Sequence, residues 1–288
     1  MFMAVSEADP AALARMRRLF KVWPRPVLNN PDFLPALARD KLARLLAGAP
    51  GICSPATLEV SRAKLERLSS GSDGMDDLLP GCSYPVLLRP TGSHAGAGLK
   101  KLDSPADLAS YLLFSFAKSY FLTAFADYRS QDGLYRKYRI AFIDQQPHLC
   151  HMAVSQDWMV HYMNAGMADS IDKRAEEADA MAHFDTTFAI RHRSAFDILQ
   201  KRLPFDYYSI DCGEMPDGRL LVFEADTAAI IHSMDSAEIF PYKQPHMEKV
   251  FDAFGHMLHV RAATVPTRPP SRRLLAQASS DHRGIGPD

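Results

Sequence analysis

The chain has 288 residues, of which 47% are hydrophobic and 23% charged, a composition typical of a globular protein with a sizeable core. Lys and Arg total 33 and Asp and Glu total 34, giving a formal net charge of −1, so we expect no nucleic-acid partner that depends on overall charge. No apolar run approaches the roughly 18 residues of a membrane helix, and the N-terminus lacks the apolar stretch of a signal peptide, which predicts a cytoplasmic protein with no membrane partner.

The first half of the chain predicts helices around one strand and a glycine-rich loop. Apolar residues at helical spacing predict a short amphipathic helix over 10–20 and a second helix over 34–48. The apolar run 84–90, which ends in proline, predicts a buried strand. The loop 91–98 follows it, and a helix is expected over 104–117, where a serine supplies the N-cap.

The second half predicts strand pairs separated by helices. Alternation of apolar and polar residues favours extended segments over 119–128 and 134–155, the latter turning at 144–147. Helical patterns follow over 172–203, and the segment 205–226 predicts a hairpin with its turn at Pro216-Asp217-Gly218. The last predicted helix covers 246–263, and residues 264–288 are expected to form a disordered tail.

The loop Gly92-Ser93-His94-Ala95-Gly96-Ala97-Gly98 is a candidate phosphate site. Small residues let backbone N–H groups approach an anion closely. The loop matches neither the Walker A pattern nor G-x-G-x-x-G, so a plain turn between two elements is an equally good interpretation of the loop alone. Arg89, at the end of the preceding strand, favours phosphate because its planar guanidinium can hold two oxygens at once.

Three carboxylates gather on the predicted hairpin. Glu224 and Asp226 are two residues apart on one strand, so both side chains leave the same face of the sheet. Asp211 lies on the paired strand and can converge on them. Three such groups repel one another unless a cation lies between them, and their hard oxygen atoms suit Mg²⁺. The alternative is that these acids point to solvent from an exposed strand face.

Four stretches, in this order, resemble the ATP-grasp superfamily, in the branch of glutathione synthetase and the ribosomal-protein glutamate ligases. "RDKLARLL" is similar to the helix whose lysine reaches ATP, here Lys41. "YPVLLRPTGSHAGAG" is similar to the strand and loop that cover the phosphates, and "DGLYRKYRIAFIDQQP" to the strand whose arginine faces the transferred phosphate, here Arg139. "YYSIDCGEMPDGRLLVFEAD" is similar to the magnesium hairpin. The resemblance covers residues 27 to 262.

The resemblance implies an α+β protein with the ATP-grasp fold, in which two α+β lobes hold a nucleotide between antiparallel sheets. We expect an N-terminal helical segment over 1–26, an N-terminal lobe over 27–118 and a C-terminal lobe over 119–263. The domain that usually leads this fold is not apparent, because only residues 1–26 precede the first lobe. A second copy in a homodimer, or a partner protein, is therefore expected to complete the acceptor site.

The resemblance also implies an ATP-dependent ligase that joins a small-molecule or peptide carboxylate to an amine, with ATP and Mg²⁺. The implied ATP contacts are Lys41, Arg89, Ser93, His94, Gly96 and Gly98, the catalytic arginine is Arg139, and the metal ligands are Asp211, Glu224 and Asp226. The chain departs from the family at Arg89, where a lysine is usual, and at Asp226, where an asparagine is usual. A phosphotransferase acting on a hydroxyl group and a non-catalytic nucleotide-binding module remain alternatives.

The segment 148–167 combines aromatic, histidine and methionine residues. Trp158, His161 and Asn164 are candidates for a wall of the substrate site, because they join a stacking surface to hydrogen-bonding groups. An ordinary role for the aromatic residues in the core is equally plausible. A zinc site is not favoured, because Cys150 and His151 leave opposite faces of a strand, and the four cysteines form no C-x-x-C pair.

Overall fold

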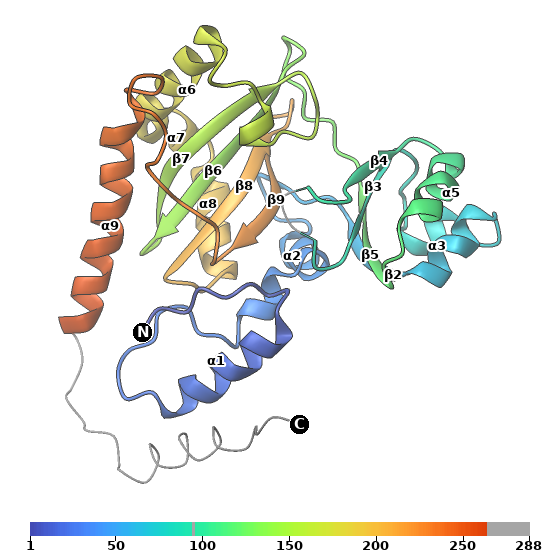
Figure 1. The fold of residues 1–288 in the computed structure, drawn as a ribbon, viewed down its shortest axis with the longest axis horizontal. Helices are drawn as coiled ribbons and strands as arrows, with labels where there is room; N and C mark the ends of the chain where they lie inside the picture. The colour runs from blue at the N-terminus through green and yellow to red at the C-terminus, as the bar shows by residue number, and fades with distance from the viewer. Residues whose placement is uncertain (94–95, 264–288) are drawn as a thin grey trace, which may run out of the picture.

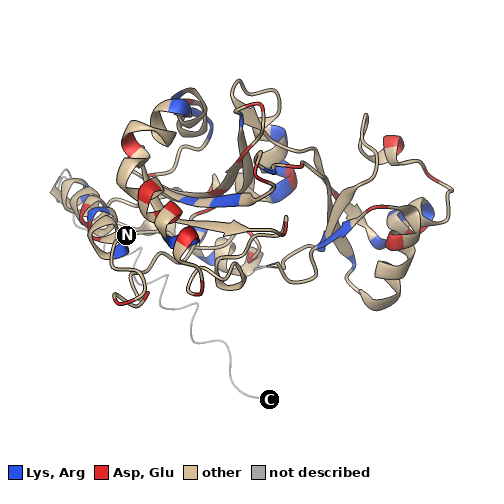
Figure 2. Cartoon of the chain, turned by 90° about the horizontal axis from the view of Figure 1, so that it is seen from above, with Lys and Arg blue, Asp and Glu red and all other residues tan. Residues whose placement is uncertain are grey.

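The structure is a computed structural model that describes residues 1–93 and 96–263. Two lobes lie side by side, a large one that contains a five-stranded sheet and a small one that contains a four-stranded sheet (Figure 1). Seen from above, Lys and Arg lie on strands of both lobes (Figure 2). The predicted α+β class is confirmed.

The large sheet has the strand order β1-β9-β8-β6-β7. All its neighbours are antiparallel except β1 and β9. The two-residue turn between β6 and β7 has positive φ at Asp144 and Gln145, the geometry of a hairpin turn that follows the twist of its strands. The strands of this sheet are β1 (Ile52–Cys53), β6 (Tyr135–Ile143), β7 (Gln146–Ser155), β8 (Tyr207–Glu214) and β9 (Leu220–Asp226).

Helices cover both faces of the large sheet. One face packs against α2, α6, α7 and α8, and α9 crosses the other face along the left side of Figure 1. The helical elements of this lobe are α1 (Pro10–Val22), η1 (Leu34–Leu37), α2 (Arg39–Leu46), η2 (Tyr162–Asn164), α6 (Ile171–His183), η3 (Phe184–Thr186), α7 (Phe188–Arg191), α8 (Arg193–Arg202) and α9 (Lys243–Ala263).

Alternation along the strands separates the core face of the large sheet from its functional face. On β6, Tyr138, Ile140 and Phe142 enter the core formed with α2 and α8. Lys137 and Arg139, which alternate with these residues, belong to the opposite face, since successive side chains of a strand point to opposite sides. The sheet therefore presents charged side chains to the space beside the small lobe.

The small lobe has its own sheet and its own core. Its strand order is β2-β5-β3-β4, with every pair antiparallel, and its core includes Leu65, Leu88, Tyr120 and Leu122. The elements of the small lobe are β2 (Thr57–Ser61), α3 (Arg62–Ser69), α4 (Met75–Leu78), β3 (Val86–Pro90), β4 (Lys100–Leu102), α5 (Pro105–Phe114) and β5 (Ser119–Ala124).

The lobe boundaries differ from those expected from the sequence. Helix α2 and strand β1 pack on the large sheet, so the part of 27–118 before β2 belongs to the large lobe. Strand β5 pairs with β2 and β3, so the small lobe extends past 118 to residue 124. The expected tail, 264–288, lies outside the described residues. Within the described part of the chain, no helix is long and apolar enough to cross a membrane.

Candidate functional site

A cavity of about 490 Å³ lies between the two lobes, within the size range of small-molecule sites. The small lobe contributes Leu87, Arg89 and Phe121, among others, and the large sheet contributes Lys137 and Asp211. The charged residues that line the cavity are Arg39, Arg89, Lys137, Arg139, Asp211, Glu224 and Asp226. Four cations and three carboxylates therefore face one cavity.

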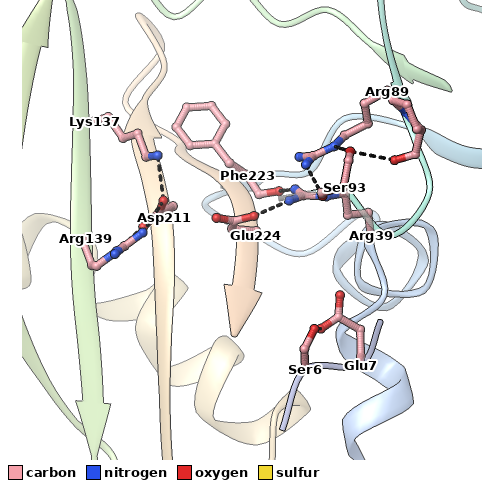
Figure 3. Close-up of polar contacts among 11 residues, drawn as sticks. Ser6, Glu7, Arg39, Arg89, Ser93, Lys137, Arg139, Asp211, Phe223 and Glu224 are labelled. Atoms are coloured by element: carbon pink, nitrogen blue, oxygen red, sulfur yellow. Dashed lines mark hydrogen bonds and ion pairs between the residues drawn. The ribbon is translucent and has the colours of Figure 1, made fainter. Parts of the chain in front are cut away.

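Asp211 on β8 is the most buried of these acids, with 3% of its side chain exposed. Its two oxygens accept hydrogen bonds from Arg139 Nε at 2.8 Å and Nη2 at 3.0 Å. Lys137 Nζ lies 2.7 Å from Oδ2 of the same carboxylate. Both cations come from β6, where Arg139 is the antiparallel partner of Asp211, so the sheet register itself brings the group together (Figure 3).

The charges in this group set its protonation. Burial by itself raises the pKa of the Asp211 carboxyl, but Lys137 and Arg139 outweigh that effect and hold the pKa well below its ordinary value. Burial likewise lowers the pKa of the Arg139 guanidinium, and the hydrogen bonds and charge of Asp211 more than reverse this. Asp211 and Arg139 are therefore both ionised near neutral pH.

Arg89 on β3 is the cation that the small lobe supplies, and it is 7% exposed. Its Nε donates to Ser93 Oγ at 3.2 Å and its Nη2 donates to the Ser93 carbonyl. Burial, followed by the nearby positive charge of Arg39, lowers the pKa of Arg89 to about 10. A desolvated guanidinium beside a second one favours an anion between them.

Arg39 is the first residue of α2 and forms an ion pair with Glu224 on β9. A second nitrogen, Nη1, donates to the Phe223 carbonyl at 3.3 Å. Glu224 lies directly opposite Asp211 in the sheet. Figure 3 shows this pair between Arg89 and the Asp211 group, so the two clusters form one continuous charged wall.

Two cations of the cavity, Arg39 and Lys137, were not predicted from the sequence, although the residue pattern carries a signal for each. Lys41 is exposed and is not among the described residues that line the cavity, so Arg39 is the cation that α2 supplies. Arg39 precedes Ala43, a buried cavity residue, by four positions, the spacing that shares one helix face. Lys137 precedes Arg139 by two positions, the spacing that shares one strand face.

The three candidate metal ligands line the same cavity, but they do not form a preformed metal site. The metal assignment therefore stays a prediction, since among the described residues no group of three or more His, Cys, Asp or Glu is placed to hold a metal ion. The reason is that cations already engage Asp211 and Glu224, while Asp226 accepts the backbone N–H of Ala228 at 2.7 Å. The donor chemistry, three carboxylates on one sheet face, still fits Mg²⁺.

The remaining predicted residues divide into those at the cavity and those away from it. Gly96, Trp158 and His161 line it. Ser93 and Gly98 are not among the described lining residues. Ser93 accepts a hydrogen bond from Arg89, and the Gly98 carbonyl accepts one from Tyr111 at 2.7 Å. Asn164 is exposed and is not among the described lining residues. His94 lies outside the described residues.

Comparison with solved structures identifies the fold. No family model matches the sequence, and neither does any curated protein. An ATP-grasp RimK domain protein from Sphaerobacter thermophilus superposes with a TM-score of 0.51 at 15% identity, covering 88% of this chain and 77% of that one. A D-alanine–D-alanine ligase from Bacillus anthracis superposes with a TM-score of 0.50 at 16% identity, with the same coverage of 88% and 77%.

Proposed function

Because the chain has the ATP-grasp fold, we propose that it is an ATP-dependent ligase that joins a carboxylate to an amine and releases ADP and phosphate. The observation that carries this proposal is the wall of four cations and three carboxylates in the cavity between the lobes. The two solved structures named above are described as ATP-grasp or ligase proteins. The fold and the charges of the cavity are therefore consistent with the same chemistry.

The cations suit a triphosphate. Phosphoryl transfer depends mostly on positioning and on neutralising negative charge, and it requires no nucleophilic side chain from the protein. Arg39 and Arg89 are adjacent cations at the border of the two lobes and would bind phosphate oxygens. Arg139 lies deeper on the sheet, fixed by Asp211, and would face the phosphoryl group that is transferred. The carboxylates Glu224 and Asp226 would hold Mg²⁺, which supplies further neutralisation of the phosphate charge when bound.

The reaction proceeds in two steps under this proposal. An oxygen of the substrate carboxylate attacks the γ-phosphorus, the bond to the β–γ bridging oxygen breaks, and ADP leaves with that electron pair. The nitrogen of the amine then attacks the acyl carbon of the acyl phosphate. Inorganic phosphate leaves, and the nitrogen loses a proton to give the amide. Arg139 stabilises the charge on the transferred phosphoryl oxygens in the first step and on the departing phosphate in the second.

The acceptor would lie against Trp158 and His161, which follow β7 and line the cavity. Trp158 is fixed by an edge-to-face contact with Phe125, with ring centroids 5.8 Å apart. Its carbonyl also accepts a hydrogen bond from Tyr128 at 2.7 Å. A held aromatic ring beside an imidazole provides a stacking surface and a hydrogen-bonding group for a small polar substrate.

The test is a coupled search for products. The protein is incubated with Mg-ATP and pooled amino acids and short peptides, and ADP, phosphate and adducts that have lost one water are measured by mass spectrometry. The Glu224→Gln variant should show no Mg-dependent turnover while its circular dichroism spectrum stays unchanged. Arg44→Gln is the matched control, because Arg44 lies on α2 but pairs with Asp40 rather than with a cavity residue.

Three outcomes would contradict the proposal. Turnover in Glu224→Gln equal to that of the original protein would remove this site as its source. ADP together with a phosphorylated acceptor and no amide would indicate a phosphotransferase. Binding of ATP without turnover across the whole panel would indicate a nucleotide-binding module.

A further inference from the structure

The ion pair between Arg39 and Glu224 joins two charged side chains of the candidate nucleotide site to each other. Arg39 comes from α2 and Glu224 from β9, two elements far apart in the sequence. Under the proposed function, on which this inference rests, the guanidinium is a phosphate ligand and the carboxylate is a metal ligand. While the two side chains are paired, Arg39 cannot fully bind phosphate and Glu224 cannot fully bind a metal ion, because the contact uses Arg39 Nη2 and Glu224 Oε2.

The neighbouring carboxylate shows what a permanent pair in this cavity looks like. Asp211, directly opposite Glu224, is 3% exposed and is held by two cations, Lys137 and Arg139. In the other pair, Arg39 is 21% exposed, similar to Arg139 at 23%, but the carboxylate Glu224 is 35% exposed and has one cation as its partner. Because water reaches both side chains, they can separate without unfolding of the sheet, and neither charge is left buried without a partner.

Arg39 also lies beside a group that repels it. Its charge is the second cause, after burial, that lowers the pKa of Arg89. An anion between the two guanidiniums would relieve this repulsion and would attract Arg39 away from the sheet. Once Arg39 has moved, Glu224 is a free carboxylate that faces the same anion and requires a cation.

We propose that Arg39 and Glu224 exchange partners when the nucleotide binds: the guanidinium passes to a phosphate of the nucleotide, and the carboxylate passes to the divalent cation that accompanies it. Charge is conserved in the exchange, since one internal ion pair is replaced by two pairs with the ligands. The ligand-free protein thus keeps its metal carboxylate occupied by its own arginine. Binding of nucleotide and binding of divalent cation are then coupled, because each ligand releases the residue that the other requires.

The test separates the two ligands. Binding of Mn²⁺ alone is measured by electron paramagnetic resonance, and binding of ATP alone is measured by calorimetry in the presence of EDTA. Arg39→Gln should bind Mn²⁺ about tenfold more tightly than the original protein, a change within the usual range of coupling between sites. Glu224→Gln should bind metal-free ATP about tenfold more tightly, because Arg39 is then free for phosphate.

Two controls locate the effect. The double variant Arg39→Gln/Glu224→Gln should lose the gain in Mn²⁺ affinity, because the freed carboxylate is gone. Arg44→Gln removes a cation from the same helix, where it pairs with Asp40, and should leave both affinities unchanged. Thermal unfolding of each variant establishes that it is folded before the titrations are compared.

The proposal is overturned if Arg39→Gln leaves Mn²⁺ binding unchanged or weaker, or if Glu224→Gln leaves metal-free ATP binding unchanged or weaker. These results are independent of catalysis. A protein that couples ATP and Mn²⁺ in this way but forms no amide would refute the ligase proposal alone. A protein that forms an amide but shows no gain of Mn²⁺ affinity in Arg39→Gln would refute the exchange alone.

Discussion

Single side chains determine what the cavity can bind, and Asp211 is the one on which the others depend. It forms ion pairs with both Lys137 and Arg139, and only 3% of its own side chain is exposed. Removing one partner of a buried ion pair leaves an uncompensated charge, which is more costly than removing both partners. Asp211 is therefore as important for folding as for any ligand.

We predict that Asp211→Asn lowers the free energy of unfolding by about 3 kcal/mol at neutral pH, because two cations lose their counter-charge. The pH dependence should change as well. The folded-state pKa of Asp211 is depressed, so its contribution is present above the pKa of the unfolded chain, about 3.9, and is lost as pH falls toward the folded-state value. Urea unfolding at several pH values should therefore show a shallower loss on acidification in the variant.

Asp217→Asn is the matched control for this prediction. Asp217 also pairs with an arginine, Arg219, but both are exposed in a turn, where ion pairs contribute little. Equal loss of stability in the two variants would mean that burial of the Asp211 group is not what makes it important.

For single residues, the sequence predicts which residue types line the site better than it predicts which individual residues do. Arg89, Arg139 and the three carboxylates all line the cavity, and their roles there stay predictions. The lysine suggested by the family resemblance does not line it, because the packing of Leu42 and Leu46 on the large sheet fixes the rotation of α2. The orientation of a short helix depends on tertiary contacts, which a linear motif does not encode.

Among the elements, the β3–β4 hairpin of the small lobe contains a close contact between a glycine and a proline. Gly98 has φ of +68°, and a Cβ there would lie 2.8 Å from Pro90 Cδ, closer than two carbon atoms can pack. Pro90 directly follows Arg89 on β3. The absence of a side chain at Gly98 therefore allows the loop to return beside the strand that carries the small lobe's cation.

We predict that Gly98→Ala destabilises the small lobe by about 2 kcal/mol, from overpacking together with strain at positive φ. It should also weaken ATP binding, because β3 must shift. Gly92→Ala is the control, since Gly92 has φ of +72° but a Cβ there would meet no atom of the described residues within 4 Å. Hydrogen exchange at β3 should increase in the first variant more than in the second, and an equal increase would refute the role of the contact with Pro90.

The elements that the sequence predicted are those with long, regular patterns. The strands β6 to β9 were expected because apolar and polar residues alternate over many positions. Strands β1 and β2 were not expected, since β1 has two residues and β2 shows the burial of one residue in five. These short strands owe their conformation to partners distant in the sequence, Leu220 and Leu221 for β1 and residues 119–123 for β2, so local patterns carry little information about them.

The whole molecule consists of two cores with a charged cavity between them. The core of the small lobe, formed by residues 60–122, is separate from those of the large lobe. Separate cores allow each lobe to move as a unit, with the packing of α2 against β2 at the border between them. A ligand that contacts both Arg89 and the large sheet would hold the lobes together.

We predict that ATP with Mg²⁺ closes the two lobes. The radius of gyration from small-angle X-ray scattering should decrease, and amide exchange in β3 and β5 should slow, because a bound ligand stabilises the state to which it binds. Arg89→Gln removes the bridge from the small lobe and should abolish the decrease. A closed ligand-free protein, with the same radius in both states, would contradict this prediction.

The placement of the small lobe within the chain also bears on how the protein folds during synthesis. Strand β1 pairs with β9, and all of the small lobe lies between them in the sequence. The small lobe therefore leaves the ribosome complete, with all four strands of its sheet, while β1 still waits for its partner. In such a nascent chain the small lobe would fold first, and the cavity would form only when β9, the last strand of the large sheet, is in place.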